Sequence, residues 1–199
     1  MKKQDALKII ADKVAACTLC EELCSYRKEN EYLTVPGEGH PNADLMIIGE
    51  APGEDEAKSG SPFVGRAGKL LNTIIENVGW KREYIFIANT IKCRPPKNRD
   101  PQEDEAANCR KFLDMQIKVV DPIWIVCLGR ISSRFLLGFS EKITMGSLRG
   151  QHEYQGRKVM CTYHPSYLLR NPAAKEEVWM DLQPVIADLK EIDEQRKKS

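Results

Sequence analysis

The hydrophobic positions of this chain fall into short apolar runs separated by longer amphipathic stretches. The apolar runs predict buried strands at residues 45–49, 84–89 and 123–128, with one or two more between 143 and 162. The amphipathic stretches predict helices over about residues 4–24, 67–78, from after Pro101 to 119, 131–137 and 174–194. Apolar strands that alternate with helices are typical of a mostly parallel sheet covered by helices on both faces.

The composition limits the class of protein. The chain has 199 residues, of which 42% are hydrophobic, and we expect it to form a single domain over residues 1–199. Its apolar runs stay below the ~18 residues that a membrane-spanning helix needs, and the N-terminus leads into an amphipathic helix rather than a signal peptide. Seven cysteines, an odd number, indicate a reducing cytoplasm. Because the net charge is only +1, any affinity for nucleic acid has to come from local patches.

The first candidate for chemistry is the segment Gly49–Gly53, which directly follows an apolar run. Its glycines and proline predict a strand that opens into a tight loop. Glu50 therefore lies at a strand end, which is where open α/β sheets bind their ligands. A second Gly-rich loop, residues 61–68, carries the aromatic Phe63. For the first loop alone, a strand-to-helix turn with solvated acidic residues is the alternative explanation.

A split set of cysteines is the second signal. Two of them form a C-x-x-C and two lie far along the chain: Cys17, Cys20, Cys93 and Cys109. Four thiolates suit either tetrahedral zinc or a [4Fe–4S] cluster, and the spacing leaves both open, as well as unrelated reduced thiols. Cys24 competes with the members of the C-x-x-C, whereas Cys127 and Cys161 lie in apolar runs and are expected to be buried core thiols.

Asn89 ends the second predicted strand and is followed by a basic loop. An amide side chain offers both a donor and an acceptor, as needed to read the edge of a planar base. The loop carries four positive charges without an acid between them, and they suit phosphates: Lys92, Arg94, Lys97 and Arg99. A solvated basic loop is the alternative explanation.

His164 follows the last predicted strand and precedes Pro165. At this strand end it is expected to face the same crevice as Glu50 and Asn89, where it can stabilise a developing anion. Taken singly, a histidine is more often a structural hydrogen-bonding residue. The coincidence of polar signals at successive strand ends favours a functional site.

Together these motifs resemble the family 4 uracil-DNA glycosylases, the iron–sulfur branch of the uracil-DNA glycosylase superfamily. The resemblance is carried by GEAPGEDEAKSGSPFVGRAGKLL, NTIKCRPPKNRDP, Cys109 and HPSYLLR, and it runs from Cys17 to about Arg170. It implies a Rossmann-like, three-layer α/β/α fold with a central, mostly parallel four-stranded sheet. It also implies a monofunctional glycosylase that hydrolyses the bond between uracil and deoxyribose in DNA, the first step of base-excision repair. The cysteine set then ligates a [4Fe–4S] cluster, partly through the N-terminal helix.

The resemblance also implies roles for individual residues. Phe63 stacks on a flipped uracil, Asn89 reads its edge, and Gly49 and Ala51 complete the pocket. Glu50 and His164 are the catalytic residues, Glu50 either orienting water or stabilising the sugar cation and His164 acting near uracil O2. The basic loop and a second loop are expected to contact DNA, with Leu168 or Leu169 as a wedge in the duplex; the second loop contributes Ser166, Leu168, Leu169 and Arg170.

Two alternatives bear on activity. A sister group that becomes covalently trapped on DNA carries Gln at the position of Ala51 and an inserted basic loop that ends in a histidine, and this chain has neither. A non-catalytic iron–sulfur module for DNA binding or electron transfer is the second function class. The expected partner is uracil-containing DNA, double- or single-stranded, bound by a monomer without a membrane; the sequence leaves open whether a sliding clamp also binds.

Overall fold

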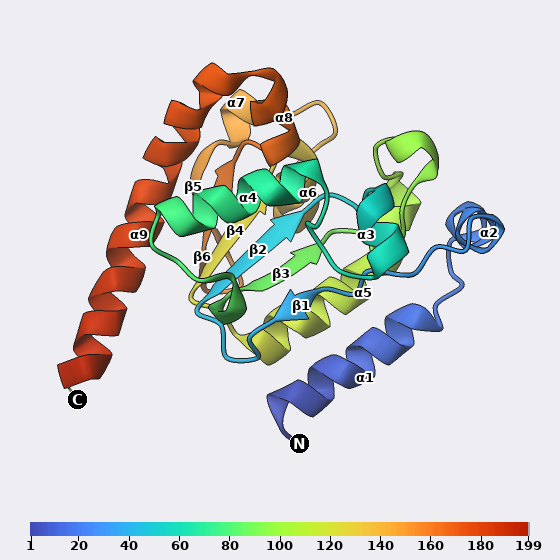
Figure 1. The fold of residues 1–199 in the computed structure, drawn as a ribbon, viewed down its shortest axis with the longest axis horizontal. Coiled ribbons are helices and arrows are strands. Elements are labelled where there is room, and N and C mark those ends of the chain that lie inside the picture. Colours follow the sequence, from blue (N-terminus) through green and yellow to red (C-terminus); the bar gives the residue numbers. More distant parts are fainter. Residues whose placement is uncertain (199) are drawn as a thin grey trace.

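The sheet that organises the fold is visible in the computed structural model, which describes residues 1–198. Within these residues the sheet has six strands in the order β1-β3-β2-β4-β6-β5 (Figure 1). Their bounds are Glu38–Gly39 for β1, Leu45–Gly49 for β2, Phe86–Asn89 for β3, Trp124–Leu128 for β4, Gly150–Tyr154 for β5 and Arg157–Thr162 for β6. The four central strands are parallel, and β1 and β5 pair antiparallel at the two edges. The predicted parallel strands are therefore present, but the prediction of a four-stranded sheet is wrong, because two antiparallel edge strands make the sheet mixed.

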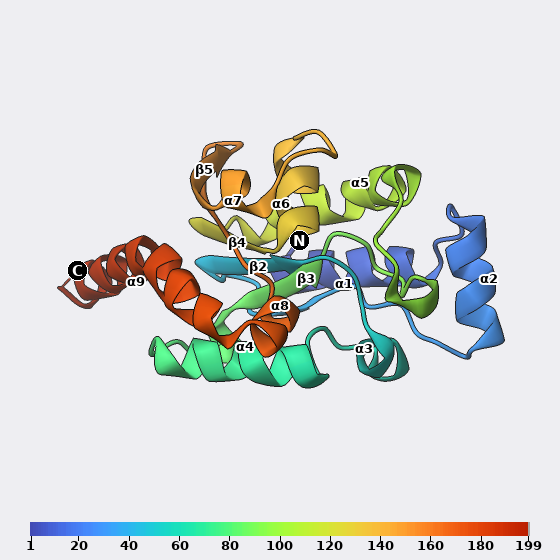
Figure 2. The ribbon, with the colours of Figure 1, turned by 90° about the horizontal axis from the view of Figure 1, so that it is seen from above.

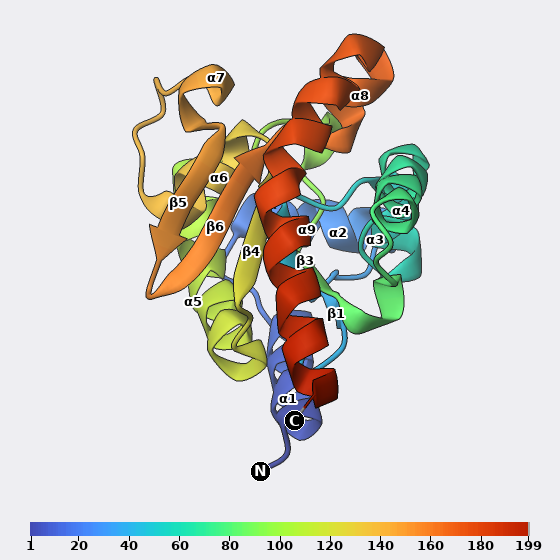
Figure 3. The same cartoon turned by 90° about the vertical axis from the view of Figure 1, so that its left-hand side faces the viewer.

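Helices cover both faces of the sheet, as the alternation of strands and helices predicts (Figure 2). The first face is covered by α1 (Lys3–Ala15), α5 (Glu103–Val120) and α6 (Arg130–Leu137). The opposite face is covered by α4 (Arg66–Asn77), α8 (Pro165–Arg170) and α9 (Lys175–Lys198). Successive strand residues point to opposite faces, so that Met46 and Ile48 pack in the first core and Leu45 and Ile47 in the second. Figure 3 shows α9 running along the second face beside β6.

The N-terminal region differs from the prediction of one helix over residues 4–24. It forms two helices, α1 and α2 (Glu21–Glu29), and the break between them contains Cys17 and Cys20. The buried stripe of α1 consists of Leu7, Ile10 and Val14, and the helix ends one residue after Val14.

Several short elements were not predicted. They are the helices α3 (Glu54–Ser59) and α7 (Met145–Leu148), α8, and three short 3₁₀ helices at Arg82–Tyr84, Pro96–Asn98 and Pro172–Ala174. The last predicted helix corresponds to α9, and Ser199 lies outside the described residues. None of the helices in residues 1–198 combines the length and the apolar character needed to cross a membrane.

The register of the sheet brings the polar strand ends together. Gly49, the last residue of β2, pairs with Asn89, the last residue of β3. On the other side, β2 pairs with β4 and β4 with β6, all in parallel, and His164 follows β6 by two residues. The carboxyl ends of these strands therefore form one edge, at which Glu50, Asn89 and His164 meet.

Candidate active site

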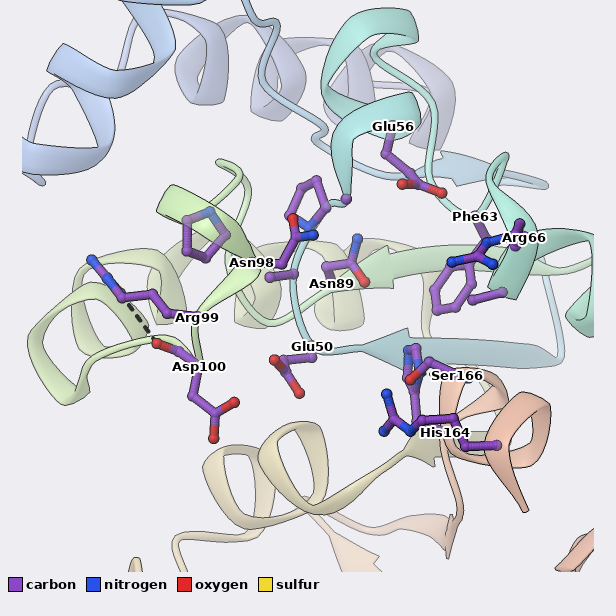
Figure 4. Close-up of a pocket in the computed structure, with 16 residues that line it drawn as sticks. Glu50, Glu56, Phe63, Arg66, Asn89, Asn98, Arg99, Asp100, His164 and Ser166 are labelled. Carbon is purple, nitrogen blue, oxygen red and sulfur yellow. Dashed lines mark hydrogen bonds between the residues drawn. The ribbon is translucent and has the colours of Figure 1, made fainter.

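A cavity of about 500 Å³ opens at this edge of the sheet (Figure 4). Eight residues predicted from the sequence line it: Glu50, Ala51, Phe63, Asn89, Arg99, His164, Ser166 and Arg170. They come from the ends of β2, β3 and β6 and from the loops that follow. The structure therefore brings three separate sequence motifs into a single site.

Asn89 lies at the floor of the cavity, with only 2% of its surface exposed. Gly49 beside it permits this packing. A Cβ atom at Gly49 would lie 2.4 Å from Asn89 Oδ1 and 2.6 Å from Phe63 Cζ, which no real side chain tolerates. Gly49, predicted as a uracil-binding residue, thus allows Asn89 and Phe63 to approach each other, and it does not itself line the cavity.

Phe63 is buried and is held in an unusual backbone conformation. Its φ of 54° lies in the left-handed region, which non-glycine residues seldom adopt. Glu56 fixes the loop, because its Oε1 accepts hydrogen bonds from the backbone N–H groups of Val64 and Gly65, each at 2.9 Å. The Phe63 ring lies 5.7 Å from the His164 ring, centroid to centroid, on the wall of the cavity.

His164 caps the N-terminus of α8. Its Nδ1 accepts a hydrogen bond from the backbone N–H of Ser166 at 3.2 Å and lies 2.7 Å from Ser166 Oγ. Because a backbone N–H can only donate, Nδ1 carries no proton and the neutral ring is protonated at Nε2. Burial, with a smaller contribution from the Arg170 charge, lowers the pKa of His164 to about 4. At neutral pH this histidine is therefore an uncharged hydrogen-bond donor.

Glu50 is one of three acidic residues that line the cavity, with Glu56 and Asp100. Burial, with a smaller contribution from the negative charge of Asp100, raises the pKa of Glu50 to about 7, whereas the Arg130 guanidinium acts in the opposite direction. Asp100 forms an ion pair with Arg130 at 3.2 Å. Figure 4 shows the Glu50 and Asp100 side chains next to each other, in agreement with the effect of Asp100 on the pKa of Glu50. A pKa near neutrality suits a carboxylate that exchanges protons with water during a reaction.

Comparison with known proteins agrees with this geometry. The family model described as "Uracil DNA glycosylase superfamily" matches residues 36–183. The chain belongs to this superfamily. It is 43% identical over 192 residues to a type-4 uracil-DNA glycosylase of Saccharolobus solfataricus, covering 91% of this chain and 85% of the relative. Type-4 uracil-DNA glycosylases of Sulfurisphaera tokodaii and Thermotoga maritima are each 40% identical, covering 91% and 85% of this chain and 84% and 86% of the relatives. The resemblance inferred from the motifs is confirmed.

Several residues of this superfamily site were missed by the sequence analysis. Glu56, Arg66, Asn98 and Asp100 all line the cavity. Glu56 follows Glu54 and Asp55 in a short acidic run, and that run alone does not reveal which of the three turns inward. Arg66 begins α4, Asn98 lies within the predicted basic loop, and Asp100 directly follows that loop. All four lie inside the sequence motifs described above, and this position was the only sign of their role. The sequence analysis selected other residues from the same motifs.

The basic loop of this superfamily member does not present all of its charges to solvent. Lys92 is only 1% exposed, and its Nζ donates to Asn89 O and Gln116 Oε1, each at 2.8 Å. The prediction that Lys92 contacts DNA is therefore wrong, because its side chain is buried and its ammonium group is bonded to these two oxygens. Arg94 is buried as well and bonds to Tyr32, so it is also not available to a phosphate.

Of the other residues predicted to contact DNA, all but Leu168 lie at or near the surface. Lys97 is exposed. Arg99 lines the cavity, but its guanidinium also bonds to Glu22 and Glu105. In the second loop, Leu168 is buried in the core of the sheet's second face, so the prediction that it could act as a wedge is wrong. Leu169 is 48% exposed and retains that possibility as a prediction.

The four predicted ligand cysteines lie near one another. Cys93 and Cys109 belong to one buried cluster, against which Cys20 packs, and the charge on Cys17 affects the pKa of both Cys20 and Cys109. Burial is the main effect, and it raises the pKa of Cys20 to about 11 and that of Cys93 to about 12. Cys24 instead donates its thiol hydrogen to the carbonyl of Cys17, 3.6 Å away.

Nitrogen donors surround these sulfurs. Asn108 Nδ2 lies 3.6 Å from Cys20 Sγ, Arg27 Nη1 lies 3.8 Å from Cys93 Sγ, and the backbone N–H of Lys92 hydrogen-bonds Cys109. Such donors stabilise thiolates, the form that binds metals. Among residues 1–198, no group of three or more histidine, cysteine or carboxylate side chains is arranged to hold a single metal ion.

Proposed function

We propose that this protein removes uracil from DNA by hydrolysing its N-glycosidic bond, which starts base-excision repair. The observation that carries the proposal is the Asn89 amide, which is buried at the floor of a cavity that Phe63 and His164 also line. Relatives that match most of the chain bear the name type-4 uracil-DNA glycosylase.

The cavity suits a base that has been rotated out of a DNA helix. Such a base costs a few kcal/mol to unstack, and the pocket has to recover this cost. Phe63 offers an aromatic face for stacking. The Asn89 amide donates to uracil O4 and accepts from N3–H. Cytosine presents the opposite polarity at both positions, so it is rejected.

Bond breaking leaves negative charge on uracil and positive charge on the sugar. His164, neutral and protonated at Nε2, donates to uracil O2 as that charge develops, aided by backbone N–H groups near Glu50 and Ala51. Glu50 lies on the other side of the cavity, where it accepts a hydrogen bond from the attacking water and faces the sugar cation. The product is an abasic site and free uracil.

DNA lies across the mouth of the cavity in this proposal. Lys97 and Arg170 are exposed beside it, and Arg66, a residue that the sequence analysis did not select, begins α4 at its rim. Together with Arg99 and the Ser166 hydroxyl, these side chains contact phosphates on either side of the flipped nucleotide. Leu169, exposed at the end of α8, fills the space that the base leaves.

The same proposal includes a [4Fe–4S] cluster on Cys17, Cys20, Cys93 and Cys109. Three of these sulfurs receive N–H donors, and Cys24 is turned to a backbone carbonyl, which fits this choice of four. A four-iron cluster spans more space than a single ion, so its ligands stand further apart than those of zinc. When bound, the cluster supplies a cross-link between the α1–α2 break, the loop after β3 and α5. The free cysteines suit a reducing cytoplasm, where we place the protein as a monomer.

The direct experiment uses labelled oligonucleotides with one uracil opposite guanine, opposite adenine, or in a single strand. Incubation with the protein is followed by alkali, which cleaves abasic sites, and by a denaturing gel. We expect cleavage at the uracil and none in the matched thymine control. A folded, iron-containing protein that leaves all three uracil substrates intact contradicts the proposal and favours a non-catalytic DNA-binding module.

A further inference from the structure

Lys92 is a buried lysine that the reaction does not use. Its ammonium group donates to two neutral oxygens, Asn89 O and Gln116 Oε1, each at 2.8 Å. Gln116 is itself fixed, because its Nε2 donates to the carbonyl of Pro36 at 2.6 Å. Lys92 and Gln116 are both almost fully buried. The result is a continuous hydrogen-bonded chain from the backbone of Asn89 to helix α5 and on to the segment before β1.

A lysine is a costly choice for this place if its only task is to fill space. A methionine of similar length would pack in the same volume without removing a charge from water. The neighbours of Lys92 in sequence, Ile91 and Cys93, are also buried, so the segment already has an apolar anchor. We therefore assign the ammonium group the role of hydrogen-bond donor, which fixes the positions of the two oxygens that accept from it.

The turn that Lys92 holds connects two functional groups. Asn89 is at its start, and Cys93 is at its end. Within the turn, Thr90 N donates to Gly49 O at 2.9 Å and Ile91 N donates to Glu50 O at 3.2 Å, so the turn also aligns the end of β2. The backbone of Lys92 contacts α5 as well, through the sulfur of Cys109. Lys92 thus ties the turn to α5 at two points, Cys109 and Gln116.

We propose that Lys92 is a positioning residue, which fixes the Asn89 amide in the uracil pocket by tying its backbone carbonyl to Gln116 on α5. The inference rests on the proposed function, in which Asn89 reads uracil. The Asn89 amide packs against Gly49 and near the Phe63 ring, and the residue is almost fully buried, so its side chain has little room to turn. A displacement of its backbone therefore displaces the amide.

The test compares Lys92→Met and Gln116→Met with the control variant Lys118→Met. Lys118 is an exposed lysine on α5, the helix that carries Gln116. Three quantities are measured on each purified protein: the dissociation constant of free uracil by equilibrium dialysis, the single-turnover excision rate, and the melting temperature. We expect Lys92→Met and Gln116→Met each to raise the dissociation constant of free uracil by about tenfold, because a hydrogen bond that recognises uracil is misaligned. We expect excision to slow by ~10–100-fold, with iron content and affinity for undamaged DNA retained. Lys118→Met should match the wild type.

The two single variants and the double variant also form a double-mutant cycle. Because both act on one chain of hydrogen bonds, the double variant Lys92→Met/Gln116→Met should lose less than the product of the two single losses. A Lys92→Met protein with a lower melting temperature but wild-type uracil affinity and rate overturns the inference, since the lysine would then be structural only. If Lys92→Met does not fold, Gln116→Met decides in the same way. A wild-type protein that neither binds nor excises uracil refutes the proposed function itself, and the inference with it.

Discussion

Nδ1 of His164 accepts a hydrogen bond from the backbone N–H of Ser166, and this contact decides what the histidine can do. It fixes the tautomer with the proton on Nε2 and caps α8 at the same time. Nδ1 therefore acts as the helix cap, while the proton on Nε2 is the donor that the proposed function requires. Each can be tested separately, because a lost cap affects folding and a lost donor affects the reaction rate.

Replacing His164 by alanine should slow single-turnover excision by ~10²–10³-fold, the usual cost of a lost donor to a developing oxyanion. The lost cap should cost only about 1 kcal/mol of stability. Rates and melting temperatures are measured in parallel, with His40→Ala, which lies at the opposite end of β2, as the control. A well-folded His164→Ala enzyme with a wild-type rate would remove His164 from the mechanism.

The rate should depend on pH through Glu50. In the proposed mechanism its carboxylate is the active form, and its pKa is about 7. The single-turnover rate should therefore rise with pH, be half-maximal near pH 7 and level off about one pH unit above that value. His164 stays neutral over this range, because burial lowers its pKa to about 4. Asp100→Asn removes a negative charge that raises the pKa of Glu50, so the midpoint should move to lower pH. A midpoint that does not move would show that Asp100 has no influence on Glu50.

Stability should depend on pH through the same residue. The pKa of Glu50 rises from 4.5 to about 7 on folding, so between these values the folded protein holds a proton that the unfolded chain has released. Glu50 therefore favours folding least above pH 7, where burial of its charge is fully unfavourable. Glu50→Gln should raise the free energy of unfolding at pH 8 by roughly 1–3 kcal/mol and change it little at pH 4. Urea denaturation at both pH values measures this, and equal effects at the two would contradict a buried, titrating Glu50.

The proposed iron–sulfur cluster should be detectable in the purified protein by its colour and by its iron and sulfide content. Prepared without oxygen, the protein should be brown and contain about four iron and four sulfide per chain. Cys17→Ser should lose iron and stability, whereas Cys24→Ser, the matched control on α2, should keep its iron because its thiol faces a backbone carbonyl. Stoichiometric zinc without sulfide would contradict the cluster, and loss of iron from Cys24→Ser would reassign the ligand.

The sequence was sufficient to predict those residues of the site that lie at strand ends. Glu50, Asn89 and His164 each follow a short apolar run, and parallel strands bring such ends to one edge regardless of the rest of the fold. The edge strand β1 was harder to predict. β1 has only two residues, Glu38 and Gly39, and both are exposed, so no apolar pattern marks it. The cysteine break between α1 and α2 was missed because an amphipathic stretch continues on either side of it.

The direction of single side chains could not be predicted from charge or hydrophobicity. Lys92 belongs to a run of basic residues, yet it turns into the interior because the turn after β3 directs it toward Gln116, a residue 24 positions away. Leu168 and Leu169 differ only in which face of the short helix α8 they occupy, and α8 has too few residues to show a period. Asp100 acts on Glu50 only through tertiary structure, which no local pattern contains.

The measurement that bears most directly on uracil recognition compares the wild type with Asn89→Asp in single-turnover excision. A carboxylate at this position places an acceptor against uracil O4, which also accepts, so two oxygens repel where a hydrogen bond was made. Asn77→Asp, on an exposed position of α4, is the control. We predict that Asn89→Asp slows uracil excision by ~10²-fold or more, with iron content and binding to undamaged DNA retained. An Asn89→Asp enzyme that excises uracil at the wild-type rate would contradict the assignment of Asn89 as the residue that reads the base.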